Sequence, residues 1–265
     1  MSEYLITFIL GIVQGITEFL PISSDGHLEL AKFFTGDQSS AIDSLQLTVI
    51  LHVATTLSII FVFRKEIIKI FSGLLSKSDP SARTFAWLVI LSMIPAAIVG
   101  VFFEELVSSL FEGKILMVSV FLFINGLILL SSKIRKPAEG AITPKVAIFM
   151  GLSQALAILP GISRSGSTIS TAMLLGVDRN KAASFSFLMV VPLILGKIAK
   201  DLMEGDFMVS TYSLGAISFG FIAAFLSGIA ACYMMLQIVA KVRLHYFAWY
   251  CMIVGIGMII FIQSQ

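Results

Sequence analysis

The chain has 265 residues, of which 57% are hydrophobic, 11% are aromatic and only 13% are charged, and its formal net charge is +2. Its mean hydropathy is +0.98, whereas soluble chains carry about 25% charged residues. This composition excludes an ordinary soluble domain, and the small net charge argues against a nucleic-acid partner. The sequence therefore predicts an all-α, polytopic membrane protein that is surrounded by membrane lipid.

In chain order, six windows without Asp, Glu, Lys or Arg supply most of the roughly 20 apolar residues that a bilayer-crossing helix needs. They cover residues 45–63, 85–103, 115–132, 182–196, 207–240 and 246–265. Pro95 and Pro192 lie inside two of these windows, and we expect them to kink their helices rather than end them. The sequence thus predicts six transmembrane helices.

Two further apolar regions, residues 4–34 and 146–177, are broken midway by Pro, Gly, Ser and isolated charges. Irregular backbone at membrane depth persists only where protein or a water-filled cavity satisfies its polar groups. We therefore expect each region to form a re-entrant helical hairpin, which returns to the side from which it entered.

The connections between these spans predict the orientation of the chain. Basic residues gather in four of them: Arg64, Lys65, Lys69, Lys77 and Arg83; Lys133, Arg135, Lys136 and Lys145; Arg179 and Lys181; Lys241 and Arg243. An excess of Lys and Arg marks cytoplasmic loops, so we expect these four inside the cell. The acidic connections and both chain ends then lie outside. The acidic residues are Glu104, Glu105 and Glu112 in one connection and Asp201, Glu204 and Asp206 in the other.

The two broken regions also resemble each other. Gly11, Gln14, Ile22, Ser23 and Gly26 each recur 140 residues later as the same residue type. Each half of the chain, about 1–135 and about 140–265, then consists of one hairpin followed by three spans, and three spans turn the second half upside down. The sequence predicts one membrane domain built as an inverted repeat, whose binding site should lie at the repeat interface.

Polar side chains are concentrated in the first hairpin. Gln14 and Glu18 are one helical turn apart and face the same way. Ser23 and Ser24 can cap the following helix, where hydroxyls lie beside free backbone N–H groups, and His27 is one turn further on the face of Ser24. This combination is suited to binding an anion.

The second hairpin places an arginine at the start of its second helix. Ser163, Arg164, Ser165, Gly166 and Thr168 occupy that start. Helix N-termini bind phosphate, an ionisable residue at membrane depth is by default functional, and the guanidinium fork matches phosphate oxygens. Two structural readings stay open, in which the serines are only caps and Arg164 is a buried partner of Glu18.

Other ionisable residues have structural readings. We interpret His52 as a satisfied core residue of an apolar helix, and His245 as a residue of an interfacial loop. Glu29 and Lys32 are about one turn apart and should neutralise each other.

The segments QGITEFLPISSDGH and PGISRSGSTI closely resemble the signatures of the bacterial undecaprenyl pyrophosphate phosphatase family of the bacitracin-resistance type. Those signatures are (E/Q)xxxE followed by LPxSSxGH, and PGxSRSGxT, and the resemblance covers essentially the whole chain. It implies an enzyme of the bacterial inner (plasma) membrane that converts undecaprenyl diphosphate to the monophosphate and inorganic phosphate. The implied cofactor is Mg²⁺ or Ca²⁺, and the implied active site faces the outer side.

The resemblance also implies roles for individual residues. Glu18, Ser24, His27 and Arg164 are the catalytic positions, with Glu18 also the metal ligand and Arg164 the phosphate clamp. We expect the other polar groups of the hairpins to bind the substrate: Gln14, Ser23, Ser163, Ser165, Gly166 and Thr168. Gln14 stands where many members have Glu, and Asp25 has no assigned role.

Phosphoanhydride hydrolysis depends mainly on positioning and on neutralising charge. The preferred mechanism has Ser24 attack the outer phosphorus with His27 as base, which forms a phosphoserine. In the alternative mechanism, His27 itself attacks or activates water. The diphosphate carries more negative charge than Arg164 can neutralise, so a cation held by Glu18 is expected.

A second class of function is transport, because a polyprenyl-phosphate flippase of the inverted-repeat type would use the same arginine and helix ends. A pure transporter has no need of a Ser24–His27 pair. A homodimer is compatible with the sequence, which does not determine the oligomeric state, the cation or whether the protein also flips its product.

Overall fold

A computed structural model describes residues 1–36, 41–76, 79–103, 106, 114–133, 139–204, 212–241 and 244–264 of the chain. Within these ranges the secondary structure is helical, without strands. The backbones of Gly140 and Val177 form an isolated β-bridge. The predicted all-α class is confirmed for this part of the chain.

The described helices are divided between the two halves of the chain. The first half contains α1 (Glu3–Thr17), α2 (Ser24–Thr35), α3 (Ala41–Val62), α4 (Arg64–Ser76), α5 (Pro80–Phe102) and α7 (Ile115–Ser131). The second half contains α8 (Pro144–Leu156), α9 (Arg164–Leu174), α10 (Arg179–Glu204), α11 (Leu214–Lys241) and α12 (His245–Gln263).

Four helices in the described ranges, α5, α10, α11 and α12, are long and apolar enough to cross a membrane. The pair α3 and α4 is a fifth candidate, although the chain bends by 75° at the break between them. The helices α1 and α7 are apolar but shorter, with 15 and 17 residues. These lengths and compositions support a multi-pass membrane protein.

Three elements differ from the sequence-based expectation. The basic connection after residue 63 contains the helix α4, and α10 continues past the window that ended at Gly196. A search for uncharged windows misses such segments, because amphipathic and terminal helical turns carry charges. His245 is the first residue of α12 rather than a loop residue, and its buried ring stacks 4.4 Å from the ring of Tyr246.

Both prolines that were expected inside helices are found there. Pro95 lies inside α5 and Pro192 lies inside α10, so neither proline ends its helix. The acidic connection between α5 and α7 and most of the acidic connection between α10 and α11 lie outside the described residues.

Each broken region forms two helices joined by a short non-helical turn. Ser23 caps α2 and Ser163 caps α9, because each side chain accepts a hydrogen bond from a backbone N–H three residues later, at Gly26 and Gly166. Two helices, the second capped by a serine, are therefore present in each of the two broken regions.

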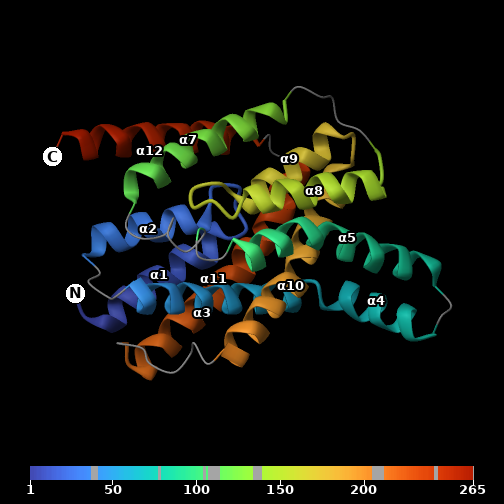
Figure 1. Cartoon of the computed structure of the whole chain (residues 1–265), viewed down its shortest axis with the longest axis horizontal. Coiled ribbons are helices and arrows are strands. Elements are labelled where there is room, and N and C mark those ends of the chain that lie inside the picture. Colours follow the sequence, from blue (N-terminus) through green and yellow to red (C-terminus); the bar gives the residue numbers. More distant parts are fainter. Residues whose placement is uncertain are drawn as a thin grey trace.

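The first helix of each hairpin packs against a long helix of the opposite half. In Figure 1, α8 lies along α5, and α1 packs in the same way along α11. The last helices of the two halves, α7 and α12, also lie along each other. A Cβ atom at Gly11 would lie 2.3 Å from the carbonyl oxygen of Gly220, and one at Gly151 would lie 2.3 Å from that of Ser92. Glycine at these repeat-related positions permits the close approach of both helix pairs.

The hairpin turns lie in the middle of the molecule, between the long helices (Figure 1). Phe19, in the first turn, is fully buried and packs edge-on against Phe187 of α10 at 5.7 Å. The start of α1 and the end of α12 lie at one end of the molecule, and α4 lies at the opposite end. This arrangement places the turns of the two broken regions at the centre of the fold.

Candidate active site

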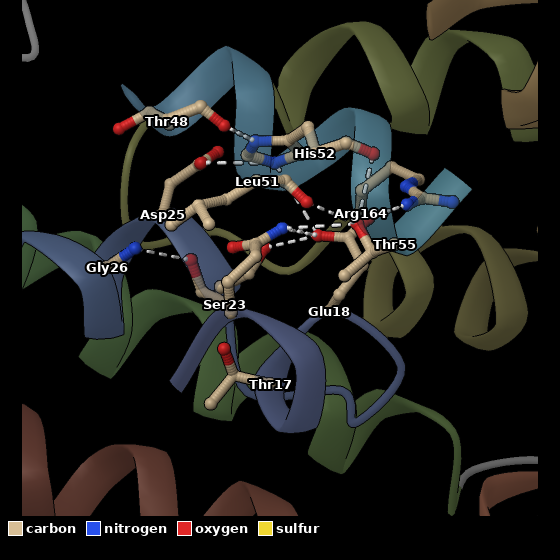
Figure 2. Close-up of polar contacts among 12 residues, drawn as sticks. Thr17, Glu18, Ser23, Asp25, Gly26, Thr48, Leu51, His52, Thr55 and Arg164 are labelled. Carbon is tan, nitrogen blue, oxygen red and sulfur yellow. Dashed lines mark hydrogen bonds and ion pairs between the residues drawn. The ribbon is translucent and has the colours of Figure 1, made fainter. Parts of the chain in front are cut away.

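The carboxylate of Glu18 connects the two hairpins (Figure 2). Glu18 follows α1 in the first turn and is only 6% exposed. One carboxylate oxygen, Oε2, accepts hydrogen bonds from Ser24 Oγ at 2.7 Å and from Gln14 Nε2 at 3.0 Å. The other oxygen, Oε1, forms an ion pair with Nη2 of Arg164. The structure thus brings together the four polar groups that the sequence placed on two separate hairpins.

His52 is a part of this cluster that the sequence interpretation assigned to the core. Its Nε2 lies 3.5 Å from Glu18 Oε2 and 3.5 Å from Asp25 Oδ1. Its Nδ1 donates to the backbone carbonyl of Thr48 at 2.8 Å, because a carbonyl oxygen can only accept. Figure 2 shows the ring between the two carboxylates. The core interpretation was wrong, since a lone histidine in an apolar helix carries no local sign of its distant partners.

Two buried polar atoms beside Glu18 are unsatisfied within the described part of the chain. They are Oε1 of Gln14 and Nη1 of Arg164. Gln14 is fully buried, and its Nε2 also lies 3.4 Å from Thr55 Oγ1. A buried polar group without a partner costs about 1–3 kcal/mol, so these atoms fit a site that receives a polar ligand, with the guanidinium as a donor to an anion.

His27 is directed away from Ser24. Its Nδ1 donates to the backbone carbonyl of Ser23 at 2.8 Å, so its Nε2 can accept a hydrogen bond from Tyr250 OH, also at 2.8 Å. The rings of His27 and Tyr250 stack with centroids 5.6 Å apart. The expected Ser24–His27 pair is therefore not formed. The first turn of α2 directs Ser24 toward Glu18 and directs His27, three residues later, toward α12.

The other predicted substrate-binding residues are buried next to the cluster. They are Ser23, Ser163, Ser165, Gly166 and Thr168. Ser23 and Ser163 use their hydroxyls as helix caps, Ser165 Oγ lies 3.3 Å from the Leu20 carbonyl, and Thr168 Oγ1 lies 2.6 Å from Ser186 Oγ. These side chains thus hold the two hairpins and α10 in place around the cluster.

The Glu29–Lys32 ion pair predicted from their spacing is present, with 2.9 Å between Oε1 and Nζ. Lys32 Nζ also donates to Thr48 Oγ1 at 3.0 Å. Because the Thr48 carbonyl accepts from His52, polar contacts continue along the α2–α3 interface from this pair to the cluster.

The described residues supply few protein ligands for a divalent cation. They contain no group of three or more His, Cys, Asp or Glu side chains able to hold a metal ion. Mg²⁺ in phosphate-processing sites is usually held by one or two carboxylates together with substrate phosphates and water. The residues therefore fit a cation that is shared with the substrate, for which Glu18 is the candidate protein ligand, and not a metal site built from protein alone.

Comparison with known proteins identifies the family. The family model described as bacitracin resistance protein BacA matches residues 7–257. The chain belongs to the BacA family. Membership was expected from the two hairpin motifs, and it extends over nearly the whole chain.

Named relatives cover the chain almost completely. A BacA relative from Christiangramia forsetii, named undecaprenyl-diphosphatase, is 52% identical over 257 residues, which is 97% of each chain. A protein of the same name from Bacteroides fragilis is 42% identical over 267 residues, with 99% of this chain and 100% of the relative covered. A third, from Methanobrevibacter smithii, is 40% identical over 273 residues, with coverage of 97% and 96%.

Proposed function

We propose that this BacA-family protein is a membrane phosphatase that hydrolyses undecaprenyl diphosphate to undecaprenyl phosphate and inorganic phosphate. This reaction would recycle the lipid carrier of cell-wall synthesis. Relatives named for this activity match the chain over nearly its whole length. The structural observation that carries the proposal is the 2.7 Å hydrogen bond from the Ser24 hydroxyl to Glu18, whose other oxygen pairs with Arg164. A nucleophile, a base and a phosphate-binding cation thus meet in one buried cluster.

The reaction begins with Ser24. Its Oγ attacks the terminal phosphorus while Glu18 Oε2 accepts the hydroxyl proton, and the bond from phosphorus to the bridging oxygen breaks. Undecaprenyl phosphate leaves, and the phosphoryl group remains on Ser24. Water then attacks this phosphoserine, the bond from phosphorus to Ser24 Oγ breaks, Glu18 returns the proton to Oγ, and inorganic phosphate is released. We assign the base to Glu18 rather than His27, because Glu18 is the group that accepts the Ser24 hydrogen bond.

Arg164 binds the phosphoryl group in this mechanism. Its guanidinium lies at the N-terminus of α9, where free backbone N–H groups and the helix dipole also favour an anion. Its Nη1 is a buried donor without a partner in the described structure, so it can reach a phosphoryl oxygen while Nη2 keeps its contact with Glu18. This geometry lets one side chain align the base and stabilise the charge that develops in the transition state.

We further propose that Mg²⁺ or Ca²⁺ accompanies the substrate. A diphosphate carries two to three negative charges, which exceed what Arg164 and two helix N-termini, at about half a charge each, can neutralise. When bound, the cation would supply the missing positive charge. Glu18 is the protein carboxylate placed to contribute a ligand.

We also propose six membrane spans and two re-entrant hairpins, arranged as an inverted repeat within one domain of the bacterial plasma membrane. Support comes from the paired hairpins and from the repeat-related contacts of Gly11 and Gly151. The basic residues of α4 lie at the end of the molecule opposite the start of α1 (Figure 1). With that end in the cytoplasm, the first hairpin is anchored at the outer side, and the site opens there.

Phosphate release separates this function from transport. Purified protein in detergent should release inorganic phosphate from undecaprenyl diphosphate and leave the monophosphate, and the Ser24→Ala variant should not. A transporter would move a polyprenyl phosphate between leaflets of a vesicle without releasing phosphate. The absence of phosphate release by well-folded protein, with Mg²⁺ or Ca²⁺ present, would overturn the proposed function.

A further inference from the structure

A buried asparagine on α7 contacts the turns of both hairpins. Asn125 is fully buried, with 0% of its surface exposed. Its Nδ2 donates to the backbone carbonyl of Pro21 in the first turn at 3.1 Å, and its Oδ1 accepts from the backbone N–H of Ser163 in the second turn at 2.9 Å. Asn125 is 104 positions from Pro21 and 38 positions from Ser163 in the chain. One side chain therefore joins two segments that are remote in sequence.

We propose that Asn125 is a positioning residue for the phosphatase reaction, which sets the placement of Ser24 relative to Arg164. Pro21 precedes Ser24 by three residues, and Ser163 directly precedes Arg164. The atoms held by Asn125 thus belong to the short backbone segments that carry the nucleophile and the phosphate-binding cation. The inference rests on the proposed function, since the test measures catalysis at the proposed phosphatase site.

Both partners of Asn125 are backbone groups outside the helices. The Pro21 carbonyl lies before α2, and the Ser163 N–H belongs to the N-cap of α9. Backbone polar groups at membrane depth have to be satisfied within the protein. An asparagine amide offers one donor side and one acceptor side in a fixed plane, so a single residue can satisfy both groups and fix their separation.

Further contacts connect Asn125 to a rigid part of the fold. Its Nδ2 also lies 3.3 Å from Cys251 Sγ on α12, the helix that packs along α7. The start of α2 also lies against the second hairpin turn, because a Cβ at Gly26 would lie 3.1 Å from Cα of Gly161. The start of α2 and the second turn are therefore in contact, and Asn125 connects both hairpin turns to the α7–α12 pair.

The expected consequence concerns the chemical step. Displacement of reacting groups by about 1 Å can cost about 10²-fold in rate. Loss of an interaction that acts only in the transition state lowers kcat while KM changes little. Binding of the polyprenyl tail does not involve Asn125, which is fully buried. We therefore expect removal of the Asn125 amide to lower kcat and to change KM little.

The test uses the full-length protein in detergent and compares Asn125→Leu with Ser119→Ala. Leucine has the same number and branching of side-chain heavy atoms as asparagine, and none of them is polar. Ser119 is a fully buried residue of the same helix whose hydroxyl donates to the carbonyl of Ile115 in its own helix, at 2.7 Å. The measurements are kcat and KM for undecaprenyl diphosphate, the inhibition constant of orthovanadate, and the melting temperature.

For Asn125→Leu we expect kcat to fall by about 10²-fold with KM within about threefold of the parent. We expect the vanadate inhibition constant to rise at least about tenfold, because vanadate would bind between Ser24 and Arg164 as a phosphoryl-group analogue. A loss of active protein alone would lower kcat and leave the inhibition constant unchanged. Ser119→Ala should match the parent in all three constants.

Folded Asn125→Leu protein with parental kcat, or with a reduced kcat and an unchanged vanadate constant, would overturn the inference. If Asn125→Leu does not fold, Asn125→Ser is judged by the same criteria, and failure of both to fold would show a purely architectural residue and also overturn it. An inactive parent protein would instead contradict the proposed function.

Discussion

The Ser24 hydroxyl donates its hydrogen bond to Glu18 and not to His27, although His27 is the nearer residue in the sequence. His27 instead contacts Tyr250 on α12, at the far end of the chain. In the proposed mechanism, this hydrogen bond directs the Ser24 hydroxyl proton to a carboxylate. That carboxylate is oriented by Arg164 on one side and by His52 on the other.

Ser24→Ala should abolish turnover, with a loss of at least about 10³-fold in kcat, because it removes the nucleophile and no other group of the cluster replaces it. Ser153→Ala is the matched control, since the Ser153 hydroxyl bonds within its own helix to the carbonyl of Met150. Phosphate release and the melting temperature are measured for both. Mass spectrometry of acid-quenched parent enzyme should find the phosphoryl group on Ser24. A phosphohistidine, sought in a parallel sample denatured at mildly alkaline pH because its P–N bond is acid-labile, would support attack by His27.

His27→Gln should lower kcat/KM by only about tenfold, far less than Ser24→Ala, because His27 neither contacts Ser24 nor accepts its proton in this geometry. Tyr250→Phe, which removes the hydroxyl bonded to His27, should have an effect no larger than that of His27→Gln. Steady-state kinetics of the two variants decide the question. A loss with His27→Gln as complete as that of Ser24→Ala would restore His27 as the base.

His52→Leu should reduce kcat/KM by about 10- to 10²-fold, since it removes the group that lies against both Glu18 and Asp25 and leaves two carboxylates facing each other. His52→Gln keeps one N–H donor at about the same distance and should recover part of the loss. The matched control is His245→Gln, which lies at the start of α12. Equal activity of His52→Leu and the parent would remove His52 from the site.

Arg164→Lys should cost nearly as much activity as Arg164→Ala. Lysine keeps the charge but lacks the two parallel N–H donors that can contact Glu18 and a phosphoryl oxygen together. If Arg164 were only a charge partner of Glu18, lysine would largely replace it. Measurement of kcat/KM for both variants distinguishes these readings, and a nearly parental lysine variant would exclude Arg164 from catalysis.

Chelation by EDTA should remove the activity of the parent protein, and added Mg²⁺ or Ca²⁺ should restore it. Glu18→Asp keeps a carboxylate but withdraws it from the site, so it should raise the cation concentration for half-maximal activity by about tenfold. Glu3→Gln, at an exposed carboxylate bonded to Ser213, is the control and should not change this concentration. Activity that is insensitive to the chelator would end the cation proposal.

Impermeant maleimide added to intact cells should label Leu214→Cys but not Leu75→Cys. These side chains are 80% and 84% exposed and lie at the start of α11 and near the end of α4. The native Cys232 and Cys251 are buried and should stay unlabelled. Labelling of Leu75→Cys alone would invert the proposed orientation.

Much of this architecture follows from local sequence. Hydropathy located the long helices because a bilayer requires about 20 apolar residues in a row. The serine caps of α2 and α9 were predictable because capping depends on residues three positions apart. The two hairpin motifs also led to Glu18, Ser24 and Arg164, which the structure brings into contact.

Other features depend on contacts between residues far apart in the chain, which only the tertiary structure decided. His52 joins the cluster through the packing of α3, Tyr250 takes His27 away from Ser24, and Asn125 joins the two turns. None of these contacts has a local pattern, because a single polar residue in an apolar helix is the same in sequence whether it is buried or faces a site. By itself, the sequence determined the helices, their caps and the candidate polar residues, through short-range periodicity and capping, and the packing of distant helices decided which of those residues meet.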